Sequence, residues 1–295
     1  MAPELFTAGI DLVRRMDQRY YGATKNTTTM SVRDVMYVTR SVIPHMAEHG
    51  ITGLTIGSNA ADFPPQVPKL HRWLDRESGK DVIVAYHPYG YGGYGPTDCA
   101  ESPNGFALCT EFRTDNTGPP KNVAEVQTSL NKLRSEYPGA VVKTSTFDAF
   151  IRDVTPVKDL LPVVELEVVD TWSYGWPSDP LKIAQNRAMQ RVWAKCLASG
   201  EPTCSLDNPV IQNMSWALLK APEHTWGAPG IGWHAGKAGG EGNEYNVTKF
   251  IVHACSCCKR RSCTNGCRAR HARKATALQV HRDNNVITIV HACSC

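Results

Sequence analysis

Apolar runs typical of strands alternate with segments of helical rhythm along most of this 295-residue chain, and this alternation constrains the fold more than any other feature. We expect helices over residues 4–21, 35–49, 121–136 and 181–199, and strands over residues 51–57, 81–86, 106–112, 140–144, 163–169 and 211–221. Strands that alternate with helices predict an α/β fold with a parallel sheet and right-handed crossovers. Polar and Gly-rich residues follow the strands, on the side where such folds place their sites.

The stretch from Leu161 to Lys182 carries the strongest functional pattern. Its β-branched residues predict a buried strand over 163–169, which holds Glu165 and Glu167 and is followed by Asp170. An aromatic run comes next, consisting of Trp172, Tyr174 and Trp176. Acids and aromatics at the end of a buried strand are how α/β enzymes build sites for sugars and other polar ligands. The alternative for Glu167 and Asp170 is structural, as acids that cap the next helix.

Three further residues are candidates for chemistry. His224 lies in the sequence Glu-His-Thr-Trp after the last expected strand. An imidazole beside a carboxylate could ligate a metal or move a proton there, and a hydrogen-bonded structural histidine is the alternative. His87 also follows a strand, and we favour the structural role for it. Asp34 stands at the entrance of the expected second helix, where an acid ordinarily caps the helix.

The positive charge of the chain is concentrated near its C-terminus. Residues 250–295 contain eight of the 32 Lys and Arg residues but only one of the 28 Asp and Glu residues. The remaining body is mildly acidic and gives no electrostatic reason to expect nucleic-acid binding. The same segment holds seven of the 11 cysteines, which could chelate zinc. We favour a disordered, basic tail over residues 251–295, or a sequence appended by an altered reading of the gene.

The cysteines of the body and the N-terminal sequence favour an intracellular protein. Four scattered cysteines do not make a disulfide framework, so reduced thiols are expected. The N-terminal segment lacks the pattern of a signal peptide. Without a secretion signal, the Asn-x-Ser/Thr sequences at Asn26, Asn213 and Asn246 are expected to be coincidental. No run of about 18 apolar residues predicts a membrane span.

Several short segments of the sequence, considered together, indicate a resemblance to a known family. They are Ile56-Gly-Ser-Asn-Ala, Asp115-Asn-Thr-Gly-Pro-Pro, Ser145-Thr-Phe-Asp, Asp170-Thr-Trp-Ser-Tyr-Gly-Trp-Pro-Ser-Asp-Pro and Leu218-Leu-Lys-Ala-Pro-Glu-His-Thr-Trp-Gly. In this order they resemble a group of proteins related to the family-38 glycoside hydrolases, the class II α-mannosidases, over residues 25–250. The resemblance implies a distorted (β/α)7 barrel, a zinc ion and a retaining mechanism with two carboxylates.

The resemblance also implies roles for individual residues. The family-like sequence Asp-Val-Pro-Gly-x-Thr-Arg corresponds to Asp34-Val-Met-Tyr-Val-Thr-Arg40, which makes Asp34 the nucleophile and a zinc ligand. His224 is the second zinc ligand, and Asp170 or Glu167 is the general acid/base. The aromatic residues offer apolar faces to sugar rings, and the substrate-binding candidates are Trp172, Tyr174, Trp176, Trp226 and His87.

The sequence departs from the family pattern at its front. No His-x-Asp precedes Asp34, and the only such sequence in the chain is His281-Arg-Asp283. Because a catalytic zinc normally has about three protein ligands, we expect an N-terminally truncated member with an incomplete barrel over residues 1–250 and a separate tail over 251–295. The expected function is zinc-dependent hydrolysis of glycosidic bonds, weak or lost in this chain. The alternative is a non-catalytic remnant that binds a carbohydrate or a partner.

Overall fold

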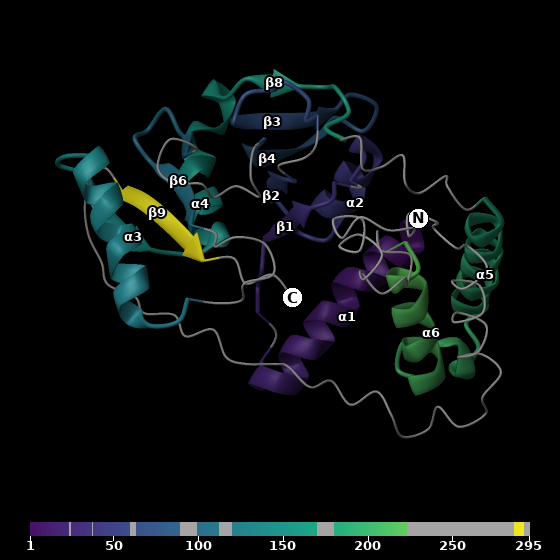
Figure 1. Cartoon of the computed structure of the whole chain (residues 1–295). Coiled ribbons are helices and arrows are strands. Elements are labelled where there is room, and N and C mark those ends of the chain that lie inside the picture. Colours follow the sequence, from purple (N-terminus) through teal and green to yellow (C-terminus); the bar gives the residue numbers. More distant parts are fainter. Residues whose placement is uncertain are drawn as a thin grey trace, which may run out of the picture. The chain divides into compact units, whose positions relative to one another are not determined.

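The computed structural model describes most of the chain as two compact units. The described residues are 1–23, 25–36, 38–59, 63–88, 99–111, 120–169, 180–222 and, for the backbone, 286–291. The first unit consists of residues 1–180 and 277–295, and the second of residues 181–276. Figure 1 shows the strands of the first unit and the helices of the second.

The larger sheet of the first unit has five strands in the order β1-β2-β4-β3-β8. Three of them, β1 (Thr29–Asp34), β2 (Gly53–Ser58) and β4 (Lys80–His87), are parallel neighbours. In contrast, β3 (Leu70–Asp75) is antiparallel to β4, and β8 (Val163–Val164) is parallel to β3. The strand β8 therefore runs opposite to β1, β2 and β4.

A tight turn explains the change of direction between β3 and β4. Residues 76–79 form the turn, and Gly79 has a φ of 67°, a left-handed conformation that suits glycine. The carboxylate of Asp75 accepts hydrogen bonds from the backbone N–H of Ser78 at 3.0 Å and from its hydroxyl at 2.6 Å. These bonds lower the pKa of Asp75, with a smaller contribution from the charge of Arg40.

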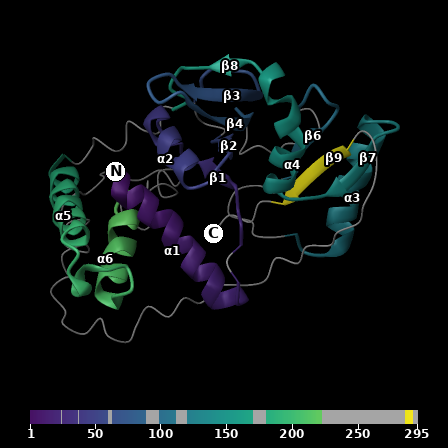
Figure 2. The ribbon, with the colours of Figure 1, turned by 180° about the vertical axis from the view of Figure 1, so that it is seen from behind.

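Alternate residues of β4 build the cores on the two faces of this sheet. Val82, Val84 and Tyr86 lie in one core with Ile43 and Met46, which belong to α2 (Ile43–Glu48). The other core contains apolar residues of β4, of α4 (Phe147–Val154) and of β6 (Ala107–Glu111), namely Ile83, Ala85, Phe150, Ile151, Val154 and Leu108. The alternation of side chains along β4, together with the apolar faces of α2 and α4, thus determines which face of the sheet each helix covers. The reverse view in Figure 2 shows the same elements from behind.

Helix α4 approaches the sheet closely because β2 begins with a glycine. A Cβ added to Gly53 would lie 2.5 Å from Cγ1 of Ile151. The N-terminus of α4 is capped by Thr146, whose hydroxyl accepts a hydrogen bond from the backbone N–H of Ala149. After α4 the chain continues through η4 (Thr155–Leu160) into β8.

The first unit also contains a second, smaller sheet. Its order is β5-β6-β9-β7, with β5 (Ala100–Glu101), β7 (Val141–Thr144) and β9 (Val286–His291) joining β6. Helix α3 (Val123–Glu136) contributes Leu133 to the core beside this sheet. The helix α1 (Pro3–Tyr21) and the short η1 (Arg40–Val42) complete the unit, and Phe6 and Ile10 of α1 pack against the core that contains Val84.

In the second unit, two helices are joined by a disulfide-bonded connection. They are α5 (Pro180–Ala198) and α6 (Pro209–Lys220), with η6 (Pro202–Cys204) between them. Cys196 of α5 forms a disulfide with Cys204. The indole N–H of the buried Trp193 donates a hydrogen bond to the hydroxyl of Ser215 at 2.9 Å, which links α5 to α6.

Several expectations from the sequence are confirmed and several are wrong. The α/β class and a mainly parallel sheet are confirmed. A closed barrel is not formed by the described residues, because β1 and β8 are the outer strands of the five-stranded sheet. Of the residues 211–221 expected to form a strand, residues 211–220 lie in helix α6, and β1 occupies residues 29–34 just before the expected second helix.

The expected strand over 163–169 and the expected separate tail also need correction. Only Val163 and Val164 pair with β3, and Leu166 is exposed, because β8 is an outer strand with one neighbour. In the tail, residues 286–291 form β9, which pairs in parallel with β6 and β7. At these six residues, the tail belongs to a sheet of the body.

The four cysteines of the body form disulfides, so the expectation of reduced thiols is wrong for them. Cys99 bonds to Cys109, and their Cα atoms are 4.3 Å apart. The register of β5 and β6 explains this pair, since Ala100 is opposite Leu108 and the next residues outward face each other. None of the described helices is long and apolar enough to cross a membrane.

Candidate functional site

Three polar residues meet at the carboxyl edge of the parallel strands. Asp34 ends β1, Ser58 ends β2 and His87 ends β4. The register places Asp34 opposite Ser58 and Gly57 opposite His87, so these residues lie on adjacent strands at one edge. This is the edge at which open α/β sheets bind ligands.

Asp34 has the most unusual backbone of this edge. Its φ is 80°, and it is the only described non-glycine residue with a positive φ. The side-chain amide of Asn59 donates a hydrogen bond of 2.6 Å to Oδ1 of Asp34, and the backbone N–H of Asn59 donates one of 3.0 Å to the Asp34 carbonyl. Backbone strain of this kind is common at functional sites. The pair therefore presents a carboxylate and an amide in fixed relative positions. Asp34 is not a helix cap.

His87 lies at the same edge but is completely buried. Burial lowers the pKa of its imidazole to about 3, and the nearby charge of Arg33 acts in the same direction, against weaker opposing effects of the Leu108 and Ile56 backbone. Neither ring nitrogen makes a hydrogen bond of normal geometry within the described part of the chain. The side chain is neutral near pH 7 and has no surface for direct contact with a sugar, which agrees with a structural role.

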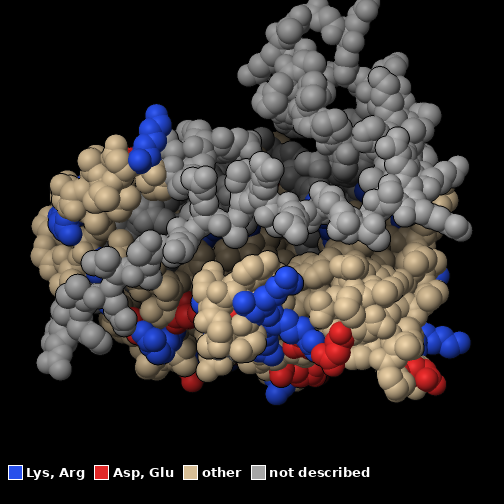
Figure 3. Space-filling view, turned by 90° about the horizontal axis from the view of Figure 1, so that it is seen from below, with Lys and Arg blue, Asp and Glu red and all other residues tan. Residues whose placement is uncertain are grey.

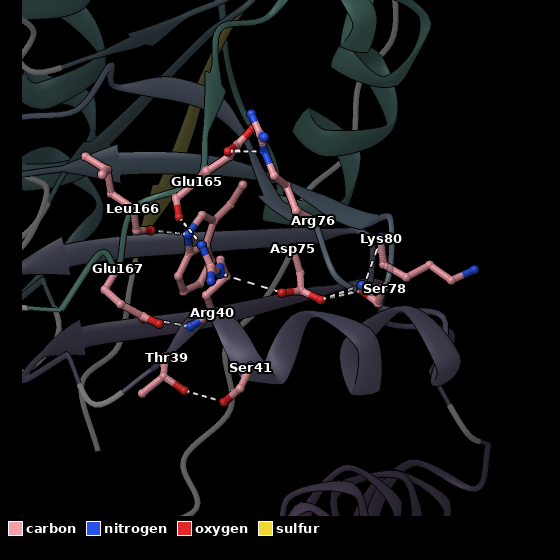
Figure 4. A network of polar contacts seen from close by, with 11 residues as sticks. Thr39, Arg40, Ser41, Asp75, Arg76, Ser78, Lys80, Glu165, Leu166 and Glu167 are labelled. Atoms are coloured by element: carbon pink, nitrogen blue, oxygen red, sulfur yellow. Dashed lines mark hydrogen bonds and ion pairs between the residues drawn. The ribbon is translucent and has the colours of Figure 1, made fainter.

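The two glutamates of the expected active strand take part in a polar network around Arg40, shown in Figure 4. The backbone N–H of Arg40 donates to the Glu167 carboxylate at 2.8 Å, and the Arg40 guanidinium donates to the carbonyl of Glu165. The guanidinium also lies 3.6 Å from the Asp75 carboxylate. Glu165 forms an ion pair with Arg76. These contacts join the segment after β1 to the segment after β8.

The direction of β8 separates these glutamates from the edge that carries Asp34. In the register, Val163 is opposite Arg72, and β3 runs from Leu70 toward Asp75, which is opposite Lys80 at the start of β4. The chain therefore leaves β8 toward the amino edge of the parallel strands. Glu167 therefore does not lie in a strand parallel to β1, β2 and β4, as the sequence led us to expect.

Six of the residues expected at the site lie outside the described residues. They are Asp170, Trp172, Tyr174, Trp176, His224 and Trp226. The expected convergence of Asp34 with Asp170 and His224 therefore remains a prediction. The structure adds Asn59 and Arg40 to the residues of interest. Asn59 could have been found from the sequence, because it lies two residues after the expected strand over 51–57, at the same edge as Asp34.

The zinc ion that the family resemblance implies remains a prediction, because its second proposed ligand, His224, lies outside the described residues. Oδ1 of Asp34 accepts an N–H from Asn59. The described residues also contain no group of three or more His, Cys, Asp or Glu side chains that could hold a metal.

The chain matches no protein-family model. A search among curated proteins finds no significantly similar sequence. The resemblance to the α-mannosidase group therefore depends on the short phrases of the sequence alone.

A cavity of about 410 Å³ opens at the opposite, amino edge of the sheet. Among its lining residues are Thr28, Asp81, Asp148 and Lys158. The acids in it bind their neighbours: Asp148 accepts the backbone N–H of Thr28 at 3.0 Å, and Asp81 forms ion pairs with Lys158 and Arg72. These contacts hold α4 and η4 against the sheet, so we interpret the charged groups of this cavity as structural.

Proposed function

We propose that this chain binds a carbohydrate at the carboxyl edge of β1, β2 and β4 without hydrolysing it. The observation that carries the proposal is the pairing of Asp34 with Asn59, which holds a carboxylate and an amide together at the edge where open α/β sheets bind ligands. Carboxylates and amides arranged in this way bind the hydroxyl groups of a sugar, as acceptor and donor. Mannose is the first sugar to test, because the sequence phrases resemble those of α-mannosidases.

Binding is favoured over hydrolysis by the arrangement of the acids. A retaining glycosidase needs two carboxyl groups about 5–5.5 Å apart. Glu167, one of the two acids proposed as partner to Asp34, follows a strand of opposite direction and accepts a hydrogen bond from the backbone of Arg40. This contact connects the segment after β1 to the segment after β8, which indicates a structural role for Glu167. Asp170, the other candidate acid, is not among the described residues.

A titration of the full chain with methyl α-mannoside tests the binding site. We expect a dissociation constant in the millimolar range, equivalent to about −4 kcal/mol. Asp34→Asn keeps the size of the side chain and tolerates the positive φ, but it removes the charged acceptor, so the affinity should fall about fivefold or more. Asn59→Ala should have a similar effect.

The matched control for this titration is Asp159→Asn, an acid-to-amide change at a carboxylate that is 91% exposed and belongs to η4. Its affinity for the sugar should equal that of the unmodified chain. Equal binding by all four proteins would show that the sugar does not use the Asp34–Asn59 pair. No binding up to saturating sugar would refute the proposed function.

The second candidate is a retaining α-mannosidase-like hydrolase, and the strained backbone of Asp34 is the observation that favours it. In that case the chain with added zinc would cleave aryl α-mannosides, and Asp34→Asn would abolish the activity. We expect slow turnover or none.

A further inference from the structure

Both disulfides of the described residues indicate an oxidising compartment. Cys99–Cys109 lies in the first unit and Cys196–Cys204 in the second, so each unit contains its own cross-link. Disulfides form and persist in secretory and extracellular environments and are rare where thiols are kept reduced. The disulfides therefore give an independent reason to reconsider the Asn-x-Ser/Thr sequences, which were set aside above for want of a secretion signal.

One of these sequences, Asn26-Thr27-Thr28, lies in an accessible loop between α1 and β1. Asn26 and Thr27 are exposed, and Lys25 beside them contacts the ring of Tyr21 at 3.6 Å. A sequence of this type in a surface loop of a secreted protein is an acceptor for N-glycosylation.

We propose that the chain matures in the secretory pathway and carries an N-linked glycan on Asn26. In this reaction the side-chain nitrogen of Asn26 bonds to the anomeric carbon of an oligosaccharide carried on a lipid diphosphate. The bond between that carbon and the phosphate oxygen breaks, the diphosphate leaves with its electron pair, and the amide loses one proton. The proposal is independent of the sugar-binding function proposed above.

The contacts of Thr28 place this modification before the first unit is fully folded. The hydroxyl of Thr28 donates to the carboxylate of Asp148 at 3.3 Å, and its backbone N–H donates to the same oxygen. Asp148 belongs to α4. The transferase has to engage the acceptor sequence in extended form, so glycan transfer precedes the docking of α4 on this loop. Once attached, the glycan extends into solvent from an exposed residue.

Asn213 provides a comparison within the same chain. It is exposed, but it lies within helix α6, and the hydroxyl of Ser215 in its acceptor sequence is buried. That hydroxyl donates to the carbonyl of Ile211 at 2.7 Å and accepts from Trp193. The helix and its packing thus oppose the extended conformation that the transferase needs.

The most direct test uses the chain isolated from cells that express it naturally. Treatment with peptide-N-glycosidase F in ¹⁸O-labelled water converts a glycosylated Asn to ¹⁸O-labelled Asp, which mass spectrometry of peptides locates. We expect labelled Asp at position 26 and, without reduction, no alkylation of the four body cysteines. An unlabelled, unmodified Asn26 peptide would overturn the proposal, and so would free thiols at Cys99 and Cys109.

Variants of the full chain expressed behind a secretory leader give a second test. Asn26→Gln should remove one glycosidase-sensitive mobility step, whereas Thr28→Ser, which keeps the acceptor sequence and the hydroxyl, should retain it. Asn213→Gln is the matched control and should leave the pattern unchanged. If Asn26→Gln keeps every glycosidase-sensitive mobility step, the assignment of the glycan to Asn26 is overturned.

Discussion

At the scale of single residues, buried polar side chains determine how this protein responds to pH. His71 and His87 are both completely buried. Burial lowers the pKa of His71 to about 4, although its Nδ1 contacts the carbonyl of Pro68 at 2.7 Å, and it lowers the pKa of His87 to about 3. Both residues are therefore neutral in the folded chain at pH values where a histidine of the unfolded chain is protonated.

The first prediction follows from the sign of these shifts. Below pH 6.5 the unfolded chain binds more protons than the folded chain, so the free energy of unfolding falls as the pH is lowered from 6.5 toward 4. Two such histidines give a limiting slope of about 2.7 kcal/mol per pH unit. Urea unfolding at several pH values should show this loss. The carboxylates with lowered pKa, Asp75 and Asp81, contribute mainly below this range.

The variant His71→Gln isolates one of the two contributions. It should reduce the slope between pH 6 and 4 by about half, whatever its effect on the stability at pH 7. An unchanged slope would mean that His71 is not held neutral by the fold.

Two acids that bind the same arginine provide a second prediction. Burial raises the pKa of Asp81, but its hydrogen bonds and charge contacts with Lys158 and Arg72 outweigh this effect and lower it. Asp159 also contacts Arg72, at 3.1 Å, but its side chain is 91% exposed. Asp81→Asn should lower the free energy of unfolding by about 2–4 kcal/mol, and Asp159→Asn by less than about 1 kcal/mol. Urea unfolding at pH 7 measures both, and equal effects would contradict this account of Asp81.

At the scale of elements, most helices and central strands could be predicted from the sequence. The helices expected over 4–21, 121–136 and 181–199 correspond to α1, α3 and α5. The strands over 51–57 and 81–86 correspond to β2 and β4, whose apolar residues are buried. Long periodic segments and buried β-branched runs are easy to recognise in a sequence, because one repeating pattern places the apolar side chains of the whole element in the core.

The elements that were missed depend on information that apolar runs do not contain. The region 211–221 was interpreted as a strand from its hydrophobicity, although Asn208 caps the helix and Pro209 begins it. The buried residues Ile211, Ser215 and Leu218 are spaced as on one helical face. The antiparallel direction of β3 depends on the turn at Gly79, and β8 pairs in parallel with β3. The sequence did not predict this turn. It therefore did not predict that Glu167 lies away from the edge that Asp34 and His87 share.

A third prediction concerns the contact between β2 and α4. Gly53→Ala should destabilise the chain by about 1–3 kcal/mol, because its Cβ overlaps Ile151. In an Ile151→Ala background the same change should cost at least about 1 kcal/mol less, since the overlapping atoms are gone. Urea unfolding of the four proteins gives the coupling energy. A coupling near zero would show that α4 does not pack on β2 at this position.

At the scale of the whole molecule, the chain divides into two units, each with an internal disulfide, and the described strands of the first unit form an open five-stranded sheet. On the face seen in Figure 3, acidic and basic side chains of the described residues lie next to each other. The described residues on that face show no large area of a single charge sign. What distinguishes the first unit is the carboxyl edge of its parallel strands, with the Asp34–Asn59 pair.

The central claim is that this edge binds a sugar and leaves it intact. One proton NMR experiment tests both parts, with an aryl α-mannoside, the full chain and zinc in the same sample over a day. We predict broadened sugar resonances that recover in Asp34→Asn, together with unchanged substrate integrals and no anomeric signal of free mannose. Steady growth of the free-mannose signal, abolished by Asp34→Asn, would contradict the account and identify the chain as a hydrolase.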